Sequence, residues 1–185
     1  MEKYIPVVVI NRLSETDNIL TALKKNNINC AEITFRTDCA AEAIAYAVKN
    51  YPDMEIGAGT VINVKQCEEA LSAGASFIVS PGLSKAVANI CKERNVAYYP
   101  GCVTPTEIMA ALEMGISTVK FFPANVYGGL TALKTLSAPF PQVKFIPTGG
   151  VDRSNMEEFL AFDKIAAVGG SFFVKESLDK MRGEQ

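Results

Sequence analysis

The chain has 185 residues, of which 49% are hydrophobic and 21% charged, and its formal net charge is −2. This length and composition are typical of one soluble globular domain with a substantial core, spanning residues 1–185. The small net charge and the absence of a basic run argue against nucleic acid or an anionic membrane as the main partner.

The start of the chain and the cysteines predict a cytoplasmic location. The apolar run near the start, Ile5–Ile10, has six residues, too few for a signal-peptide core or a membrane span. The cysteines are scattered, odd in number and never spaced as a CxxC pair, which predicts reduced, mostly buried thiols. They are Cys30, Cys39, Cys67, Cys91 and Cys102.

Histidine is absent from the chain. This excludes Ser-His-Asp and Cys-His catalysis and His-ligated zinc, and we predict no metal site. A general acid or base near pH 7 must therefore be a perturbed Glu, Asp, Lys, Cys or Tyr.

Eight short apolar runs predict β-strands, and their starts lie 20 to 26 residues apart. In chain order the runs cover residues 5–11, 30–36, 55–61, 77–82, 97–102, 118–124, 144–150 and 165–173. The segments between them show helical patterns. Ser14 with Asp17, and Thr104 with Glu107, have capping-box spacing, and Asp152 is placed to cap a helix.

Strands that are apolar on both faces and alternate with helices indicate a parallel sheet covered by helices. The prediction is an α/β (β/α)8 TIM barrel. The barrel must be compact, because the chain is shorter than the usual ~200 residues of that fold. Residues 175–185 lack a convincing apolar stripe, so we expect a short or missing C-terminal helix. An open doubly wound sheet is the alternative, although Gly57 and Gly59 do not complete a GxGxxG fingerprint.

Strand alternation places two opposite charges inside the predicted barrel. Glu32, Thr34 and Arg36 share one face of the second strand, and Lys120 and Phe122 share one face of the sixth. A polar face cannot pack against the helices and must point inward. Burying an ion pair costs several kcal/mol per ion, so this arrangement indicates a functional site rather than a structural salt bridge.

The chemistry of such a site follows from its side chains. Burial favours the neutral, nucleophilic amine of Lys120, whereas a nearby carboxylate favours the ammonium. Glu32 could carry protons through the steps of Schiff-base chemistry. Thr60 could hydrogen-bond a carbinolamine, and Arg36 could bind a substrate carboxylate through its planar fork. Cys102 lies near a strand end without a partner base, and we interpret it as inert packing.

Glycine pairs end the last two predicted strands, in PTGG (147–150) and VGGS (168–171). Backbone N–H groups after strands seven and eight of this fold recurrently bind phosphate. We therefore expect a phosphate site that includes Gly149, Gly150, Gly170 and the hydroxyl of Ser171.

Eight motifs in order, from Pro6 to about Val174, carry a family resemblance: PVVVIN, AEITFRT, GAGTV, SPGL, YPGCVTPTE, VKFFPA, FIPTGGV and VGGSFFV. Together they resemble the 2-keto-3-deoxy-6-phosphogluconate (KDPG) and 4-hydroxy-2-oxoglutarate (KHG) aldolases. The resemblance implies a class I, metal-independent aldolase on a (β/α)8 barrel, commonly a homotrimer. Such an enzyme is expected to need no cofactor, because a covalent imine with Lys120 activates the substrate. Its expected pathway is the Entner-Doudoroff pathway.

The resemblance also implies residue roles. Lys120 is the Schiff-base former, Glu32 the acid/base, and Arg36 the binder of the pyruvate carboxylate. The remaining residues are expected to contact substrate, with Phe122 against the pyruvate methyl group. They are Thr60, Pro81, Phe122, Thr148, Gly149, Gly150, Gly170 and Ser171. The chain departs from the family at Asn125, where many members have glutamate, and in lacking the longer C-terminal helix.

The expected substrates are KDPG, which yields pyruvate and glyceraldehyde 3-phosphate, and KHG, which yields pyruvate and glyoxylate. Two alternatives stay open. One is another phosphate-binding barrel enzyme without imine chemistry, an epimerase or a thiamine-phosphate-synthase-like transferase. The other is a non-catalytic barrel, which the inward Glu32, Lys120 and Arg36 argue against.

Overall fold

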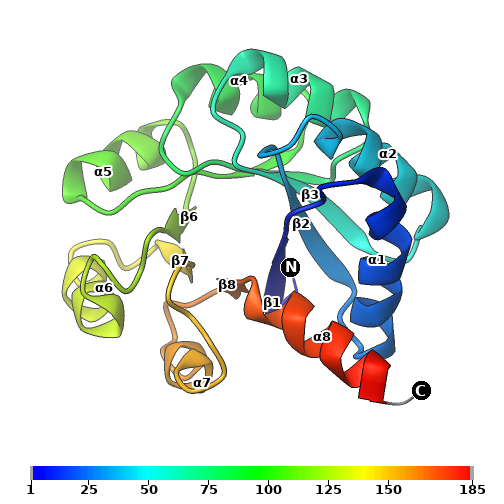
Figure 1. The fold of residues 1–185 in the computed structure, drawn as a ribbon. Coiled ribbons are helices and arrows are strands. Elements are labelled where there is room, and N and C mark those ends of the chain that lie inside the picture. Colours follow the sequence, from blue (N-terminus) through cyan, green and yellow to red (C-terminus); the bar gives the residue numbers. More distant parts are fainter. Residues whose placement is uncertain (1, 184–185) are drawn as a thin grey trace.

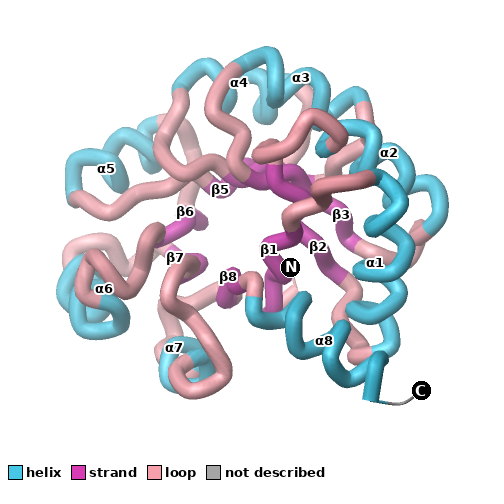
Figure 2. The backbone as a smooth tube through the Cα atoms, in the orientation of Figure 1, coloured by secondary structure: helices cyan, strands magenta, loops and turns pink. Residues whose placement is uncertain are grey.

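A computed structural model describes residues 2–183, which form a ring of parallel strands surrounded by helices (Figures 1 and 2). The strands are β1 (Tyr4–Val8), β2 (Cys30–Thr34), β3 (Glu55–Gly59), β4 (Phe77–Val79), β5 (Ala97–Tyr99), β6 (Thr118–Phe121), β7 (Lys144–Pro147) and β8 (Val168–Gly170). The predicted α/β barrel is confirmed.

The helices alternate with the strands along the chain. They are α1 (Thr16–Lys25), α2 (Ala40–Asn50), α3 (Val64–Ser72), α4 (Lys85–Glu93), α5 (Pro105–Glu113), α6 (Gly129–Ser137), α7 (Met156–Leu160) and α8 (Phe172–Gly183), with a 3₁₀ turn, η1 (Leu13–Glu15), before α1. In Figure 2 they form an outer layer around the strands.

The ring consists of two hydrogen-bonded sheets that meet at two seams. The larger sheet has the order β5-β4-β3-β2-β1-β8, and the smaller one pairs β6 with β7. Single parallel bridges, Gly101–Lys120 and Thr148–Gly169, connect the two sheets. All pairings are parallel, so the carboxyl ends of the strands open onto one mouth, where active sites of this fold lie.

The predicted apolar runs extend two or three residues beyond the carboxyl end of each observed strand. These additional residues form the loops around the mouth. The last run also begins three residues before β8, and Phe172 and Phe173 at its end begin helix α8 instead of extending the strand.

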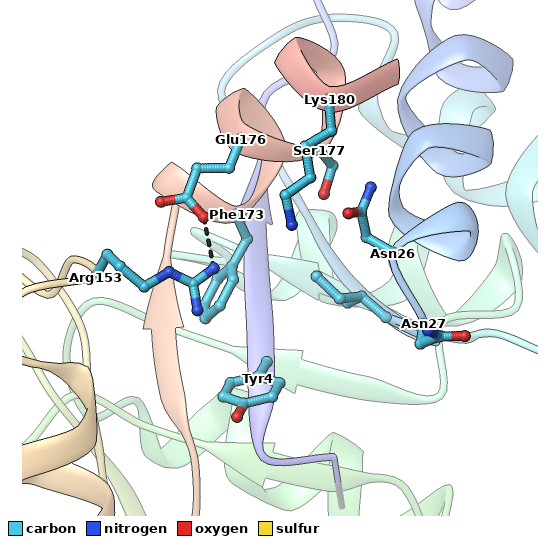
Figure 3. A pocket seen from close by; sticks show the side chains of 9 residues that line it. Tyr4, Asn26, Asn27, Arg153, Phe173, Glu176, Ser177 and Lys180 are labelled. Carbon is cyan, nitrogen blue, oxygen red and sulfur yellow. Dashed lines mark hydrogen bonds and ion pairs between the residues drawn. The ribbon is translucent and has the colours of Figure 1, made fainter. Parts of the chain in front are cut away.

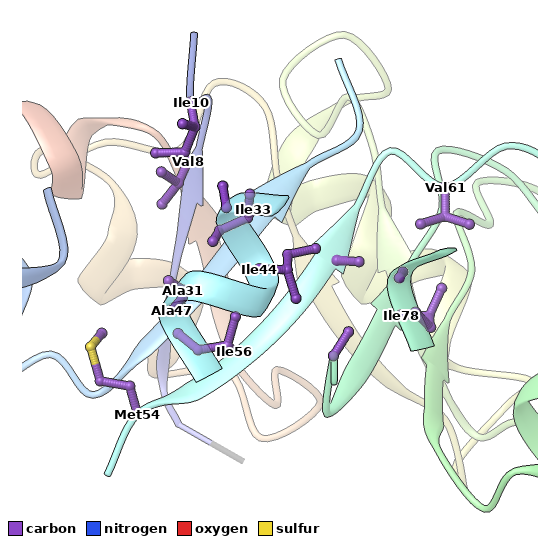
Figure 4. Close-up of a cluster of buried hydrophobic side chains, with 14 of the residues drawn as sticks. Val8, Ile10, Ala31, Ile33, Ile44, Ala47, Met54, Ile56, Val61 and Ile78 are labelled. Carbon is purple, nitrogen blue, oxygen red and sulfur yellow. The ribbon is translucent and has the colours of Figure 1, made fainter. Parts of the chain in front are cut away.

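Apolar side chains form an inner and an outer layer. The outer layer packs strands against helices, as Figure 4 shows for Val8, Ile33 and Ile44. A second outer cluster includes Val119 and Phe121 of β6. By strand alternation, the inner layer is a small cluster that fills the barrel. Its buried members are Ile5, Cys30, Phe77, Val79, Ile146 and Ala167.

The predicted helix caps have mixed outcomes. Thr104 and Glu107 form the predicted capping box of α5. The box at Ser14 and Asp17 does not form, because η1 precedes α1 and Glu15 occupies the N-cap position. The Asp17 carboxylate instead accepts a hydrogen bond of 2.6 Å from the Tyr51 hydroxyl.

Asp152 also caps a different structure from the one predicted. Helix α7 begins only at Met156, and the Asp152 carboxylate accepts hydrogen bonds from Ser154, which stabilise a turn before that helix.

The C-terminal helix, expected to be short or missing, is present as α8 over Phe172–Gly183. It packs against α1 and β1, with Phe173 and Ser177 buried. Val174 and Leu178 pack against the outer cluster around β1 and α1. The apolar positions of this helix therefore begin at Phe172, ahead of the segment 175–185, in which the sequence shows no convincing apolar stripe.

Candidate active site

Lys120 and Glu32 meet inside the barrel, as predicted. The Nζ atom of Lys120 lies 3.5 Å from Oε1 of Glu32, and the two residues are only 5% and 2% exposed. The ring centroid of Phe122 lies 5.1 Å from the same Nζ atom, so the predicted shared face of Lys120 and Phe122 is also observed. A cation over an aromatic face is attracted by the ring quadrupole.

The alternation of side chains explains why these charges point inward. Ile33 packs in the outer cluster next to the helices, so Glu32, its neighbour on β2, faces the interior. Val119 and Phe121 likewise flank Lys120 and occupy the other outer cluster. The apolar residues on either side therefore fix the direction of each charged group.

Gly59 provides the space for the Glu32 carboxylate. A Cβ atom at Gly59 would lie 2.0 Å from Oε1 of Glu32, far inside van der Waals contact. No role in the site was predicted for this glycine. The available signal was a glycine within a strand pattern, which often marks the close approach of another group.

Arg36 and Thr60 lie together at the rim of the mouth. Nε of Arg36 donates a hydrogen bond of 3.2 Å to Oγ1 of Thr60, joining the loops after β2 and β3. Thr60 has a φ of +57°, a strained conformation for a β-branched residue, and such strain clusters at functional sites. Arg36 also lines a cavity of about 490 Å³ with Lys65 and Asn63.

The predicted phosphate end is formed by the loops after β7 and β8. Gly149 and Gly150 have φ values of +84° and +76°, which L side chains rarely adopt, so this turn requires glycine. Thr148 is buried, and a Cβ atom at Gly169 would lie 2.3 Å from its Oγ1. Ser171 is exposed directly before α8, and Gly170 packs against Phe172.

Asn125, the position where the resemblance leads to an expectation of glutamate, packs against this glycine turn. A Cβ atom at Gly150 would lie 2.4 Å from the Cβ atom of Asn125. The backbone N–H of Asn125 donates a 3.1 Å hydrogen bond to the Gly149 carbonyl. Asn125 thus links the loop after β6 to the predicted phosphate end, a contact that its sequence position alone did not reveal.

Two other sequence assignments have separate outcomes. The Pro81 carbonyl lies where a Cβ atom of Gly101 would be, so the loop after β4 packs on the end of β5. Direct substrate contact by Pro81 stays a prediction. Burial, together with the charge of Glu107, raises the pKa of Cys102 to about 12, so this thiol stays protonated and fits the assigned packing role.

Comparison with known proteins identifies the family. The model of the KDPG and KHG aldolase family matches residues 1–183. The chain belongs to the KDPG/KHG aldolase family. A 2-dehydro-3-deoxy-phosphogluconate aldolase of Haemophilus influenzae is 42% identical over 176 residues, which are 95% of this chain and 83% of the relative. The KHG/KDPG aldolase of Escherichia coli strain K12 is 38% identical over 170 residues, or 92% and 80% of the two chains.

A solved KDPG/KHG-family structure agrees with the fold and the family. The KDPG aldolase of Legionella pneumophila superposes with a TM-score of 0.91 at 39% identity, covering 97% of this chain and 88% of the other. That structure contains pyruvate captured at low pH as a covalent carbinolamine intermediate. The alternative prediction, an open doubly wound sheet, is therefore wrong.

The contact between Gly59 and Glu32 yields a stability prediction. We expect Gly59→Ala to lower the free energy of unfolding by about 1–3 kcal/mol, because the new methyl group must displace a buried carboxylate. Gly82→Ala is the matched control, since a Cβ atom there meets nothing within 4 Å. Urea denaturation of both variants measures the difference, and equal stabilities would contradict the role assigned to Gly59.

Proposed function

We propose that this protein is a class I aldolase that reversibly cleaves KDPG into pyruvate and glyceraldehyde 3-phosphate, and KHG into pyruvate and glyoxylate. The observation that carries the proposal is the buried amine of Lys120, 3.5 Å from the Glu32 carboxylate at the barrel mouth. The names of the relatives and the carbinolamine in the Legionella pneumophila structure support it.

The first half of the reaction forms an imine. Lys120 Nζ, as the neutral amine, attacks the C2 ketone of the 2-keto-4-hydroxy acid, and a C–N bond forms as the carbonyl oxygen takes a proton. Glu32 protonates the resulting hydroxyl, which leaves as water and yields the protonated imine. Arg36 holds the substrate carboxylate, and Thr60 hydrogen-bonds the carbinolamine.

The second half breaks the carbon–carbon bond. A base, Glu32 directly or through water, removes the C4 hydroxyl proton, C3–C4 breaks, and the electron pair moves into the imine to give an enamine. The aldehyde leaves. The enamine carbon then takes a proton, and water hydrolyses the imine to release pyruvate and regenerate Lys120. The imine is the electron sink, so these reaction steps require no metal or organic cofactor.

The same proposal covers place and pathway. The phosphorylated sugar acid and its products fit the Entner-Doudoroff pathway, and we place the enzyme in the cytoplasm, which cell fractionation tests. Among residues 2–183, none of the helices has the length and apolarity needed to span a bilayer.

A coupled assay of pyruvate release from KDPG and KHG tests the reaction. Lys120→Ala should lower kcat/KM by about four orders of magnitude or more, because it removes the nucleophile. Glu32→Gln should lower kcat by about 10²–10⁴-fold through loss of proton transfer. Lys92→Ala, an exposed lysine on α4, is the control and should leave both constants unchanged.

The outcomes separate the candidate functions. An epimerase or a thiamine-phosphate-synthase-like enzyme would release no pyruvate from either substrate. Full activity in Lys120→Ala would overturn the assignment of the nucleophile.

Ser171 and the glycine turns support a site for the substrate phosphate. Ser171→Ala should raise KM for KDPG about five- to tenfold, because a hydrogen bond to a charged group is lost, and leave KM for unphosphorylated KHG unchanged. Steady-state kinetics with both substrates measure the effect. Equal changes for the two substrates would mean that Ser171 does not contact the phosphate.

The proposed assembly is a homotrimer. Its support in this chain is apolar surface near α5 and α6, where Val126 is 73% exposed and Met109 and Tyr127 are also exposed. A cavity of about 420 Å³ lies beside Tyr127 and Leu136. Exposed apolar groups that gather in one region mark interaction sites. Sedimentation equilibrium should give three times the chain mass of 19.9 kDa, and a species of one chain mass would contradict the trimer.

A further inference from the structure

Another cavity lies outside the barrel, beside helix α8 and at the start of β1 (Figure 3). Its volume is about 310 Å³, within the range of small-molecule sites. Its walls come from α8, the start of β1, the turn between α1 and β2, and Arg153 after β7. Lys120 and Glu32 take no part in it, so the cavity is separate from the candidate active site.

Three polar side chains converge on this cavity. Ser177 is only 2% exposed and lines the cavity. Figure 3 shows the Ser177 hydroxyl, the Asn26 amide and the Lys180 ammonium pointing toward the same space. A hydroxyl, an amide and an ammonium group that face one cavity can together hydrogen-bond a polar ligand.

The orientation of the Asn26 amide is fixed by the backbone. Its Nδ2 donates a 2.9 Å hydrogen bond to the Ala22 carbonyl, the carbonyl four residues earlier. Because the nitrogen is committed to that bond, the oxygen Oδ1 is the atom left to accept a hydrogen bond from a ligand.

The charges around the cavity leave one cation available. Arg153 and Glu176 form an ion pair with a separation of 2.5 Å, so their charges offset each other. Within the described part of the chain, Lys180 has no carboxylate oxygen within 4 Å. The cavity therefore combines a positive charge and a hydroxyl, which suit a carboxylate, with one neutral acceptor.

The remaining wall is apolar. The rings of Tyr4 and Phe173 have centroids 5.3 Å apart and stand beside Ile28. Aromatic rings offer a large contact area to the apolar body of a ligand.

We propose that this cavity binds a small 2-hydroxycarboxylic acid with an apolar body. The carboxylate contacts Lys180 and the Ser177 hydroxyl, the ligand hydroxyl donates to Oδ1 of Asn26, and the apolar body lies against Tyr4 and Phe173. An amino acid fits less well, because its ammonium group would stand next to Lys180. This inference does not depend on the aldolase reaction.

Isothermal titration calorimetry with three matched probes tests the site. The probes are 3-phenyllactate, 3-phenylpropanoate, which lacks the hydroxyl, and 3-phenyllactamide, which lacks the charge. We expect 3-phenyllactate to bind once per chain and each of the other two to bind at least about fivefold more weakly, because each loses one polar contact. The proposal would be overturned if 3-phenyllactate showed no binding at about 10 mM, a concentration that detects Kd values up to the millimolar range. Equal affinity for all three probes would also overturn it.

Variants locate the bound probe. Lys180→Gln should weaken 3-phenyllactate binding about tenfold, since a charge-assisted contact is lost. Lys175→Gln, on the face of α8 that lines a different groove, should leave it unchanged. Lys120→Ala should also leave it unchanged. Loss of binding in Lys120→Ala would place the probe inside the barrel, and an unaltered affinity in Lys180→Gln would show that the cavity is not the site.

Discussion

The burial of one amine against one carboxylate is the interaction on which the site depends. Removing two opposite charges from water costs several kcal/mol per ion, and their attraction repays this only when the geometry is held closely. Lys120 and Glu32 are nearly inaccessible and lie 3.5 Å apart. A sheet closed into a ring can hold this geometry. Each of the two side chains points into the barrel from its strand, and the residues before and after it on that strand are buried in the outer apolar clusters.

The ring closure also holds Lys120. The residue lies at a seam between the two sheets, where it forms a parallel β-bridge with Gly101. Its N–H donates 2.8 Å to the Pro100 carbonyl, and its own carbonyl accepts 2.9 Å from the N–H of Cys102. A nucleophile on regular strand backbone, hydrogen-bonded on the β5 side in this way, keeps its direction more exactly than one on a mobile loop. On the opposite side of the barrel, Gly59 leaves the space that Glu32 requires.

Strand periodicity explains why much of this could be predicted from the sequence. Side chains alternate with a period of two, so the inward direction of Glu32 and Lys120 followed from their apolar neighbours alone. Contacts between loops carry no such period. The packing of Asn125 on Gly150 and the hydrogen bond from Arg36 to Thr60 depend on how separate loops fold over one mouth. The capping box predicted at Ser14 was wrong because η1 shifts the start of α1. The start of α8 was missed because Phe172 and Phe173 also fit a strand pattern.

The central claim is that Lys120 forms the covalent bond to substrate. Borohydride reduction in the presence of pyruvate, followed by proteolysis and mass spectrometry, tests it most directly, because reduction makes an imine permanent at the lysine that formed it. The account predicts one pyruvate-derived adduct per chain, located on the peptide that contains Lys120. An adduct on a different lysine, or no adduct in an enzyme that still releases pyruvate from KDPG, would contradict it.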